Sequence, residues 1–445
     1  MISTEPVISV GVVEGRPAID GRFEGTFGIG GRTASSGTFR AWIEGEAIHL
    51  DTGGASFSGP KGVLQCVPLE GAVFSLDEVT IGIRFHWERQ ETQTFAGALI
   101  LQADDRGTLT AVNELPLETY LASVVSSEMN ALAPLAFLQA HVVASRSWLL
   151  AMLERRRAGV SPSGSKDRGR RGHGEILRWY GREDHGRFDV CADDHCQRYQ
   201  GLTKMVGGKA GEAVRATRGL ALVHDAAVCD ARYYKACGGI TDCYENAWED
   251  RTVPYLTSIS DAPHSFSPIR TEAQARRWVL SRPDCYCNTA DATILEKVLP
   301  DFDRETTDFF RWEVSYDRKA LEAILKKKSG IDFGDLQDMT PLERGPSGRI
   351  VRLRIAGSRQ AVVVGKELEI RRWLSNSHLL SSAFVVDAVG GAGELPDRFI
   401  LHGAGWGHGV GMCQIGAAMM AHQGYTEEEI LGHYFPAATL RRLYP

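Results

Sequence analysis

The chain has 445 residues, of which 43% are hydrophobic and 24% are charged, and its formal net charge is −6. This composition is typical of a globular protein, and it excludes intrinsic disorder because there is enough apolar material for a core. The acidic balance argues against a nucleic-acid partner, since nucleic-acid-binding domains are usually strongly basic. No apolar run approaches the roughly 18 residues of a membrane-spanning helix, so we expect no membrane span.

The N-terminal region, residues 1–110, is predicted to be rich in β-structure. Short strand-like runs separated by glycine clusters are typical of an all-β module. They occur at Val7–Val12, Thr38–Ile43, Val79–Phe85 and Gly97–Gln102. The chain begins without the basic and apolar segments of a signal peptide, so the sequence itself shows no export signal.

The pattern becomes helical after Leu115. Apolar residues recur at helical spacing after Pro116 and again after Pro134, which predicts two helices within Pro116–Leu153. Glu128 continues the apolar stripe at the C-terminal end of the first helix, where desolvation and the helix dipole are expected to raise the pKa of its carboxyl group. A raised pKa suits a general acid at neutral pH. The alternative is a glutamate that faces solvent beyond the last turn.

A cluster of two histidines and two cysteines follows a basic segment, residues 155–171, that is predicted to be a surface loop. Two thiols and two imidazoles form the ligand set of a tetrahedral zinc site, here His185, Cys191, His195 and Cys196. A Cys191–Cys196 disulfide or free thiols are the alternatives. Four protein ligands leave no position for water, so we expect structural zinc rather than the catalytic zinc of a hydrolase.

The remaining predicted elements alternate between strands and helices. Strands are predicted at Ala221–Val223, Val228–Tyr234, Tyr255–Ile259 and within residues 349–385. Helices are predicted over residues 271–281, 318–329, Met412–Gln423 and Thr426–Tyr434. For the other cysteines of this region, packing or a disulfide is the expected role; they are Cys237, Cys243, Cys285 and Cys287.

The glycine loop, Gly405–Gly411, precedes the first of the two C-terminal helices. Its four glycines let the backbone approach a ligand closely. His408 and Gln414 offer hydrogen bonds to a sugar or an amide. The alternative is a tight structural turn.

Three separated blocks of the sequence resemble the stage II sporulation protein D family, also called SpoIID/LytB-domain proteins. They are Leu115–Arg146 with the pair Glu128-Met129, Cys191–Gly239, and Gly405–Pro436. The blocks follow the family's order, and the resemblance covers residues 113–440 but little of the first 110. Two positions depart from the family pattern, because Cys413 stands where serine is usual and Lys235-Ala236 where small hydroxyl residues are usual.

The resemblance implies a lytic transglycosylase that acts on peptidoglycan glycan strands, or an enhancer of a cell-wall amidase. It assigns the catalytic acid and base to Glu128 and a zinc ion to His185, Cys191, His195 and Cys196. The predicted substrate-binding residues are Arg146, Tyr233, Trp406, His408 and Gln414. The resemblance also favours location in the cell envelope.

We therefore expect an α+β fold in which helices pack on mixed and antiparallel sheets around a glycan-binding cleft. A β-rich region, residues 1–110, is expected to precede a SpoIID-like catalytic domain, residues 111–445. Within that domain we expect a helical block at 115–153, a metal and strand block at 185–260, an inserted α/β segment at 261–398 and the closing loop and helices at 399–440.

Overall fold

The computed structural model describes residues 3–60, 62–83, 88–158, 168–172, 174–180, 185–205, 207–305, 308–390 and 395–445. The fold is α+β with a large β-rich N-terminal region, which confirms the predicted class. The chain divides into two compact units, which are described separately. The first contains Met1–Val160, Asp184–Ala221 and Arg441–Pro445, and the second contains Ser161–Glu183 and Leu222–Leu440. The predicted domain boundary at residue 110 stays a prediction.

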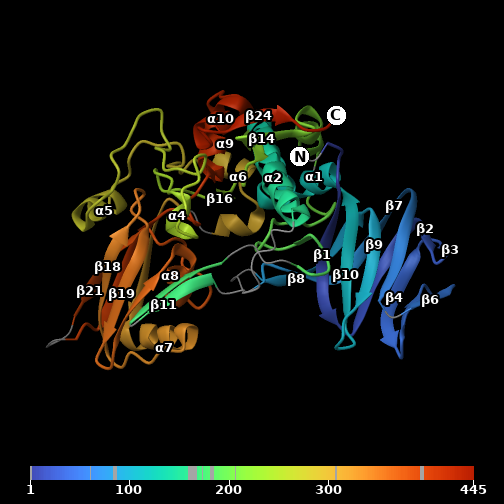
Figure 1. The fold of residues 1–445 in the computed structure, drawn as a ribbon, viewed down its shortest axis with the longest axis horizontal. Helices are drawn as coiled ribbons and strands as arrows, with labels where there is room; N and C mark the ends of the chain where they lie inside the picture. Colours follow the sequence, from blue (N-terminus) through green and yellow to red (C-terminus); the bar gives the residue numbers. More distant parts are fainter. Residues whose placement is uncertain are drawn as a thin grey trace. The chain divides into compact units, whose positions relative to one another are not determined.

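An 11-stranded sheet dominates the first unit (Figure 1). Its path runs β13-β1-β10-β9-β7-β2-β4-β5-β6, with β3 paired to β2 and β8 to β7. Antiparallel pairing is general, except that β13 runs parallel to β1. The strands are β1 (Val7–Arg16), β2 (Ala18–Ile29), β3 (Arg32–Ala34), β4 (Gly37–Glu44), β5 (Ala47–Asp51), β6 (Ser56–Pro60), β7 (Val63–Ile81), β8 (Arg89–Ala96), β9 (Ala98–Ala103), β10 (Leu109–Pro116) and β13 (Val190–Cys191).

Three helices accompany this sheet: α1 (Leu117–Glu128), α2 (Leu135–Arg157) and α3 (Lys209–Ala216). Pro116 and Pro134 each directly precede a helix, as the sequence predicts. By length and composition α2 meets the criterion for a membrane span, an apolar segment of a length that was not predicted from the sequence. Because 83% of its apolar window is buried inside the structure, α2 has the burial of a core helix.

The second unit contains two main sheets and the C-terminal helices. One sheet has the order β11-β12-β20-β19-β18 and the other β17-β22-β21. Their strands are β11 (Arg168–Gly172), β12 (Glu175–Trp179), β17 (Arg311–Asp317), β18 (Leu336–Arg344), β19 (Ile350–Gly357), β20 (Ala361–Gly365), β21 (Phe384–Val389) and β22 (Arg398–Ala404). Short strands are β15 (Ala227–Val228), β16 (Tyr233–Tyr234) and β23 (Met412–Cys413), while β14 (Leu220–His224) and β24 (Thr439–Arg442) cross the boundary between the units.

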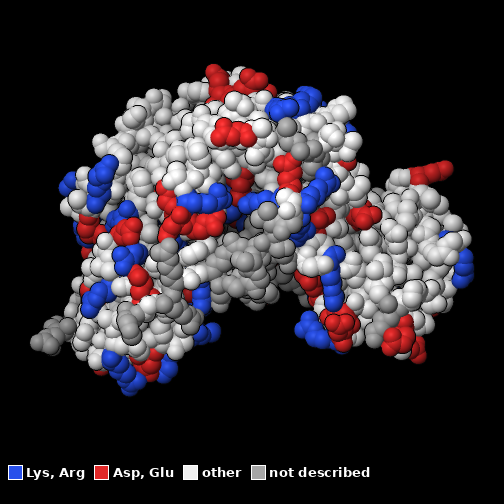
Figure 2. Space-filling model, viewed as in Figure 1, with Lys and Arg blue, Asp and Glu red and all other residues white. Residues whose placement is uncertain are grey.

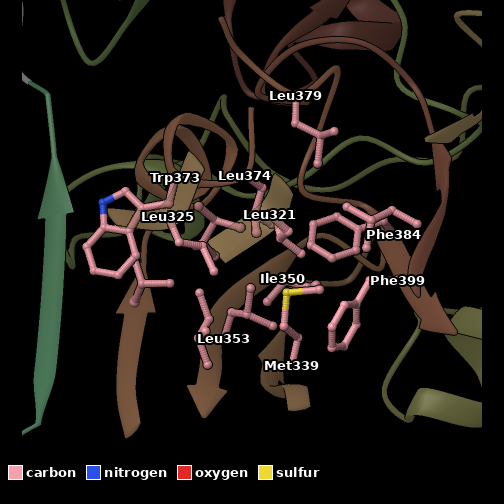
Figure 3. Close-up of a cluster of buried hydrophobic side chains, with 14 of the residues drawn as sticks. Leu321, Leu325, Met339, Ile350, Leu353, Trp373, Leu374, Leu379, Phe384 and Phe399 are labelled. Carbon is pink, nitrogen blue, oxygen red and sulfur yellow. The ribbon is translucent and has the colours of Figure 1, made fainter. Parts of the chain in front are cut away.

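The helices of the second unit cover part of these sheets. They are α4 (Tyr244–Ala247), α5 (Glu272–Val279), α6 (Ala292–Val298), α7 (Arg318–Ser329), α8 (Glu367–Trp373), α9 (Gln414–His422) and α10 (Glu427–Tyr434), with a 3-10 turn at Asp301–Glu305. Figure 3 shows Leu321 and Leu325 of α7 and Trp373 of α8 pointing into a core with Ile350 and Leu353 of β19. This apolar core fixes the sheets from which the glycine loop extends.

Several predicted elements differ from the structure. Tyr255–Ile259 forms no strand. The N–H of Ile259 donates to the side-chain hydroxyl of Thr241 and not to the backbone carbonyl of a neighbouring strand. Helix α8 lies inside the region predicted as strands, and its acidic first turn and basic last turn suit the helix dipole. The predicted strand Val79–Phe85 runs past the end of β7, and residues 84–85 lie outside the described residues, as does 159–167 of the basic segment.

Candidate functional site

Glu128 is the last residue of α1 and is 9% exposed. One carboxylate oxygen, Oε1, accepts a hydrogen bond from the backbone N–H of Arg198 at 3.0 Å. Nearby, the hydroxyl of Ser127 accepts from the backbone N–H of Gln200 at 3.2 Å. Residues 197–200, here called the backing segment, therefore lie against the C-terminal end of α1 and hold the Glu128 carboxylate in place.

A buried ion pair joins α1 to α2. Arg146 is 0% exposed, and its guanidinium donates to both carboxylate oxygens of Glu118, from Nε to Oε1 at 2.9 Å and from Nη2 to Oε2 at 2.6 Å. Its Nη1 donates to the carbonyl of Leu220 at 2.9 Å, and Tyr444 donates to Glu118 at 2.6 Å. In this geometry Arg146 positions α1, so its predicted contact with a glycan stays a prediction.

The His/Cys cluster, defined as His185, Cys191, His195 and Cys196, lies in the first unit, and its ligand atoms all lie within 4.8 Å of one another. Nε2 of His185 lies 3.3 Å from Sγ of Cys196, and Nδ1 of His195 lies 3.4 Å from the same sulfur. Hydrogen bonds from Cys196, His185 and His195 lower the pKa of the Cys191 thiol to about 2, so the thiolate form is favoured. The donor set and its spacing fit a tetrahedral zinc ion.

Local packing explains how the chain brings this cluster together. Cys191 ends β13, which pairs with β1 at Gly11, and a side chain at Gly11 would clash with the ring of Phe188. Phe188 in turn stacks on His185 with ring centroids 4.6 Å apart. The backing segment follows Cys196 directly, where Tyr120 of α1 donates to Gln197 at 3.1 Å. Only Gln197 separates Cys196 of the His/Cys cluster from Arg198, whose N–H donates to Glu128.

The glycine loop belongs to the second unit, and Gly405, Gly407, Gly409 and Gly411 all have positive φ. Arg349 is buried beneath it and donates to the carbonyls of Gly407 and Cys237, each at 3.2 Å. A Cβ on Gly409 would lie 2.4 Å from the guanidinium carbon of Arg349. Glycine is therefore required at 409 for this buried arginine to hold the loop.

His408 lies in an aromatic and cationic setting within the same unit. Its ring meets those of Tyr234 and Trp248 at centroid distances of 5.2 and 4.9 Å. Burial, and then the charges of the arginines at 232, 349 and 371, lower the pKa of His408 well below its ordinary value. Nδ1 accepts from the N–H of Val410 at 3.1 Å, which leaves the proton of the neutral ring on Nε2.

The other predicted substrate-binding residues occupy different positions around the loop. Tyr233 is half-buried in β16 and pairs with Met412 of β23. The backbone of Trp406 exchanges hydrogen bonds with Ala236 at 2.8 and 3.0 Å. Gln414 is 2% exposed in the first turn of α9, which places it among buried side chains. Tyr233, Trp406, His408 and Gln414 lie in the second unit and Glu128 in the first, so the predicted cleft that unites them stays a prediction.

A second group of potential metal ligands is present that the sequence did not indicate. The Cys/Asp cluster, defined as Cys237, Asp261, Cys287 and Cys413, is buried, and its ligand atoms lie within 4.8 Å of one another. Spacing along the chain gave no signal, since Cys237 and Cys413 are 176 positions apart. Such a cluster offers a complete ligand set for one metal ion.

Charged side chains of both signs share the surface. Figure 2 shows basic and acidic groups interspersed on its visible face, in keeping with 50 lysines and arginines against 56 aspartates and glutamates.

Comparison with known proteins finds two family models that match parts of the chain. Residues 105–224, which hold α1, α2, Glu128 and the His/Cys cluster, match the model described as Stage II sporulation protein (SpoIID). Residues 105–224 are therefore similar to the SpoIID domain family. Residues 242–411 match a domain of unknown function, DUF8618, which takes in most of the second unit.

Distant relatives carry related names. The chain is 24% identical over 335 residues to Stage II sporulation protein D of Bacillus amyloliquefaciens, covering 73% of this chain and 74% of the relative. It is 25% identical over 327 residues to the protein of the same name in Bacillus subtilis (strain 168), covering 73% and 74%. It is 21% identical over 241 residues to the Amidase enhancer of Bacillus subtilis (strain 168), covering 52% of this chain but only 32% of that protein.

Proposed function

We propose that this protein cleaves peptidoglycan glycan strands by a lytic transglycosylase mechanism, with Glu128 as the single general acid and base. The observation that carries the proposal is the position of Glu128 at the end of a buried helix, with one oxygen fixed by the Arg198 N–H. A carboxyl group with one oxygen fixed by a backbone N–H is held in one orientation, which suits proton transfer. The match of residues 105–224 to the SpoIID family model supports the substrate class.

The chemistry needs only this one carboxyl group. Glu128 gives its proton to the leaving glycosidic oxygen, and the carboxylate then takes the proton of the 6-hydroxyl of N-acetylmuramic acid. That hydroxyl attacks its own anomeric carbon and closes a 1,6-anhydro ring. Because the attacking group belongs to the same sugar, positioning replaces the second carboxylate that a hydrolase uses.

The other predicted residues serve binding and support in this proposal. The His/Cys cluster holds a structural zinc ion, which when bound supplies a fixed cross-link with no open position for water. That cross-link holds the backing segment, and hence the Arg198 N–H, against Glu128. His408 and Trp406 contact the sugar, and the His408 ring is neutral there. Because the proposed substrate is peptidoglycan, the proposal locates the protein in the cell envelope.

A second candidate function rests on the relative named Amidase enhancer. In this second candidate function, the protein binds a wall glycan or an amidase and does not cleave the glycan strand. The two candidates differ in whether the purified protein changes the glycan.

The experiment compares cleavage of peptide-stripped glycan by the full chain and two variants. Glu128→Gln removes the transferable proton and keeps the shape, so we expect a loss of about 10²–10⁴-fold. Glu14→Gln, an exposed position on β1, is the matched control and should retain full activity. Full activity in folded Glu128→Gln contradicts the catalytic role. Glycan binding without cleavage by any form supports the enhancer.

A further inference from the structure

The Cys/Asp cluster brings together four stretches of the second unit that are far apart in the sequence. Cys237 follows β16, Asp261 follows the bridge between Ile240 and Ser260, and Cys287 follows α5. Cys413 ends β23 and is the N-cap of α9. All four residues are buried. We propose that they bind a second zinc ion, distinct from the ion assigned to the His/Cys cluster, and that this ion fixes the base of the glycine loop.

The spacing of the ligand atoms fits one ion. Sγ of Cys237 lies 3.4 Å from Sγ of Cys287, and no two of the four ligand atoms are more than 4.8 Å apart. A tetrahedral ion with Zn–S bonds of about 2.3 Å holds its sulfur ligands about 3.8 Å apart. An iron–sulfur cubane needs its cysteine sulfurs much farther apart. The three thiolates are soft ligands, and they favour zinc over magnesium or calcium although the fourth ligand is a carboxylate.

Backbone donors surround the sulfurs, an arrangement that suits thiolate ligands of a metal. The N–H of Cys237 donates to Sγ of Cys413 at 3.3 Å, and the N–H of Gly416 donates to the same sulfur at 3.4 Å. The N–H of Gly239 donates to Sγ of Cys237 at 3.2 Å. Gly416 lies in the first turn of α9, the positive end of the helix dipole. Donors of this kind stabilise thiolate ligands and orient them toward a metal.

Asp261 is oriented just as closely. Its Oδ1 accepts from the hydroxyl of Tyr434 at 2.5 Å and its Oδ2 from the N–H of Cys287 at 3.0 Å. A Cβ at position 416 would lie 2.4 Å from Oδ1 of Asp261, so glycine is required there for the carboxylate to enter. A carboxylate buried this deeply is costly unless it is paired or coordinates a metal. A divalent ion supplies that balance.

The proposed ion acts on the glycine loop from both sides. Cys413 lies two residues beyond Gly411, and Cys237 follows Ala236, whose backbone is paired with Trp406 of the loop. One ion would therefore cross-link Cys413, just beyond the loop, to the Cys237 segment that pairs with the loop. The proposal does not depend on glycan cleavage, because it concerns the metal content of the second unit.

Zinc content per chain, measured by elemental analysis on the purified full-length protein, tests the proposal. The natural protein should carry two zinc ions, and Cys413→Ser, a substitution of similar size, should lower the content by one. Cys229→Ser is the matched control, since Cys229 is another buried cysteine of the second unit outside both clusters. Zinc that is unchanged in Cys413→Ser overturns the proposal.

A second measurement keeps the proposal testable if Cys413→Ser does not fold. In a Cys191→Ser background the His/Cys cluster is disabled, so one metal ion should remain. Cobalt(II) bound in place of zinc should then show the absorption of a tetrahedral site rich in thiolates. Absence of bound metal in that background, or an intact mass that shows a Cys237–Cys287 disulfide, overturns the proposal. The two sites can be told apart, because Cys191→Ser reports on the metal of the His/Cys cluster and Cys413→Ser on that of the Cys/Asp cluster.

Discussion

The ion pair between Arg146 and Glu118 gives the sharpest prediction on stability. Arg146→Met removes the guanidinium and leaves the Glu118 carboxylate, whose side chain is 7% exposed, without its bidentate partner. Breaking one side of a buried ion pair costs about 3–5 kcal/mol. Tyr444 and the N–H of Gly219 continue to donate to Glu118, so we expect about 3 kcal/mol, the lower end of that range.

The double variant isolates the electrostatic part. Glu118→Gln in the Arg146→Met background removes the stranded charge, so the double variant should be more stable than Arg146→Met alone. Hydrogen exchange of α1 and α2 amides in urea is the suitable assay, because a chain of two units need not unfold in one step. An Arg146→Met protein with unchanged α1 protection but weakened glycan binding would refute the structural role and favour the predicted substrate contact.

Three further outcomes follow from the sites. Cys191→Ser should lower the zinc content and speed hydrogen exchange at the Arg198 amide, because the binding free energy of the metal stabilises the fold around it. Loss of zinc with unchanged exchange at the Arg198 amide contradicts the idea that the metal holds this amide against Glu128. Gly409→Ala should destabilise the second unit by more than the roughly 1–2 kcal/mol that a left-handed backbone conformation costs a residue other than glycine, since the new Cβ would meet Arg349. Gly424→Ala, where no atom lies within 4 Å of the new Cβ, is the control. Equal losses of stability in the two variants contradict the account. The folded-state pKa of His408 is lowered, so the stability of the second unit should be full above the ordinary histidine pKa of about 6.5 and should fall as the pH drops below it. This fall should be less steep in His408→Asn, and His433→Asn, at another histidine whose pKa is lowered by burial, is the comparison. Identical pH profiles of stability in the natural and His408→Asn proteins refute this prediction.

The helices and the His/Cys cluster were predictable because their signals are local. Helical periodicity together with Pro116 and Pro134 indicated α1 and α2, and residues 318–329 coincide with α7. The histidines and cysteines of the first cluster lie within one short segment, so their chemistry is visible in the sequence.

The long-range features were not predictable from one sequence. Asp261 of the Cys/Asp cluster belongs to no motif, and its partners come from segments far along the chain. Helix α8 has only seven residues, too few to show a period within a region rich in strands. Arg349 gave no signal either, because its role depends on reaching the glycine loop 58 positions away.

Mass spectrometry of the fragments released from peptide-stripped glycan in heavy-oxygen water tests the central claim most directly. Cleavage with Glu128 as the single acid and base predicts 1,6-anhydro ends, lighter than hydrolysed ends by one water molecule and free of the heavy isotope. Release of these ends should be lost in Glu128→Gln and kept in Glu14→Gln. Reducing ends that carry the heavy isotope, or an intact glycan under all conditions, would contradict the account.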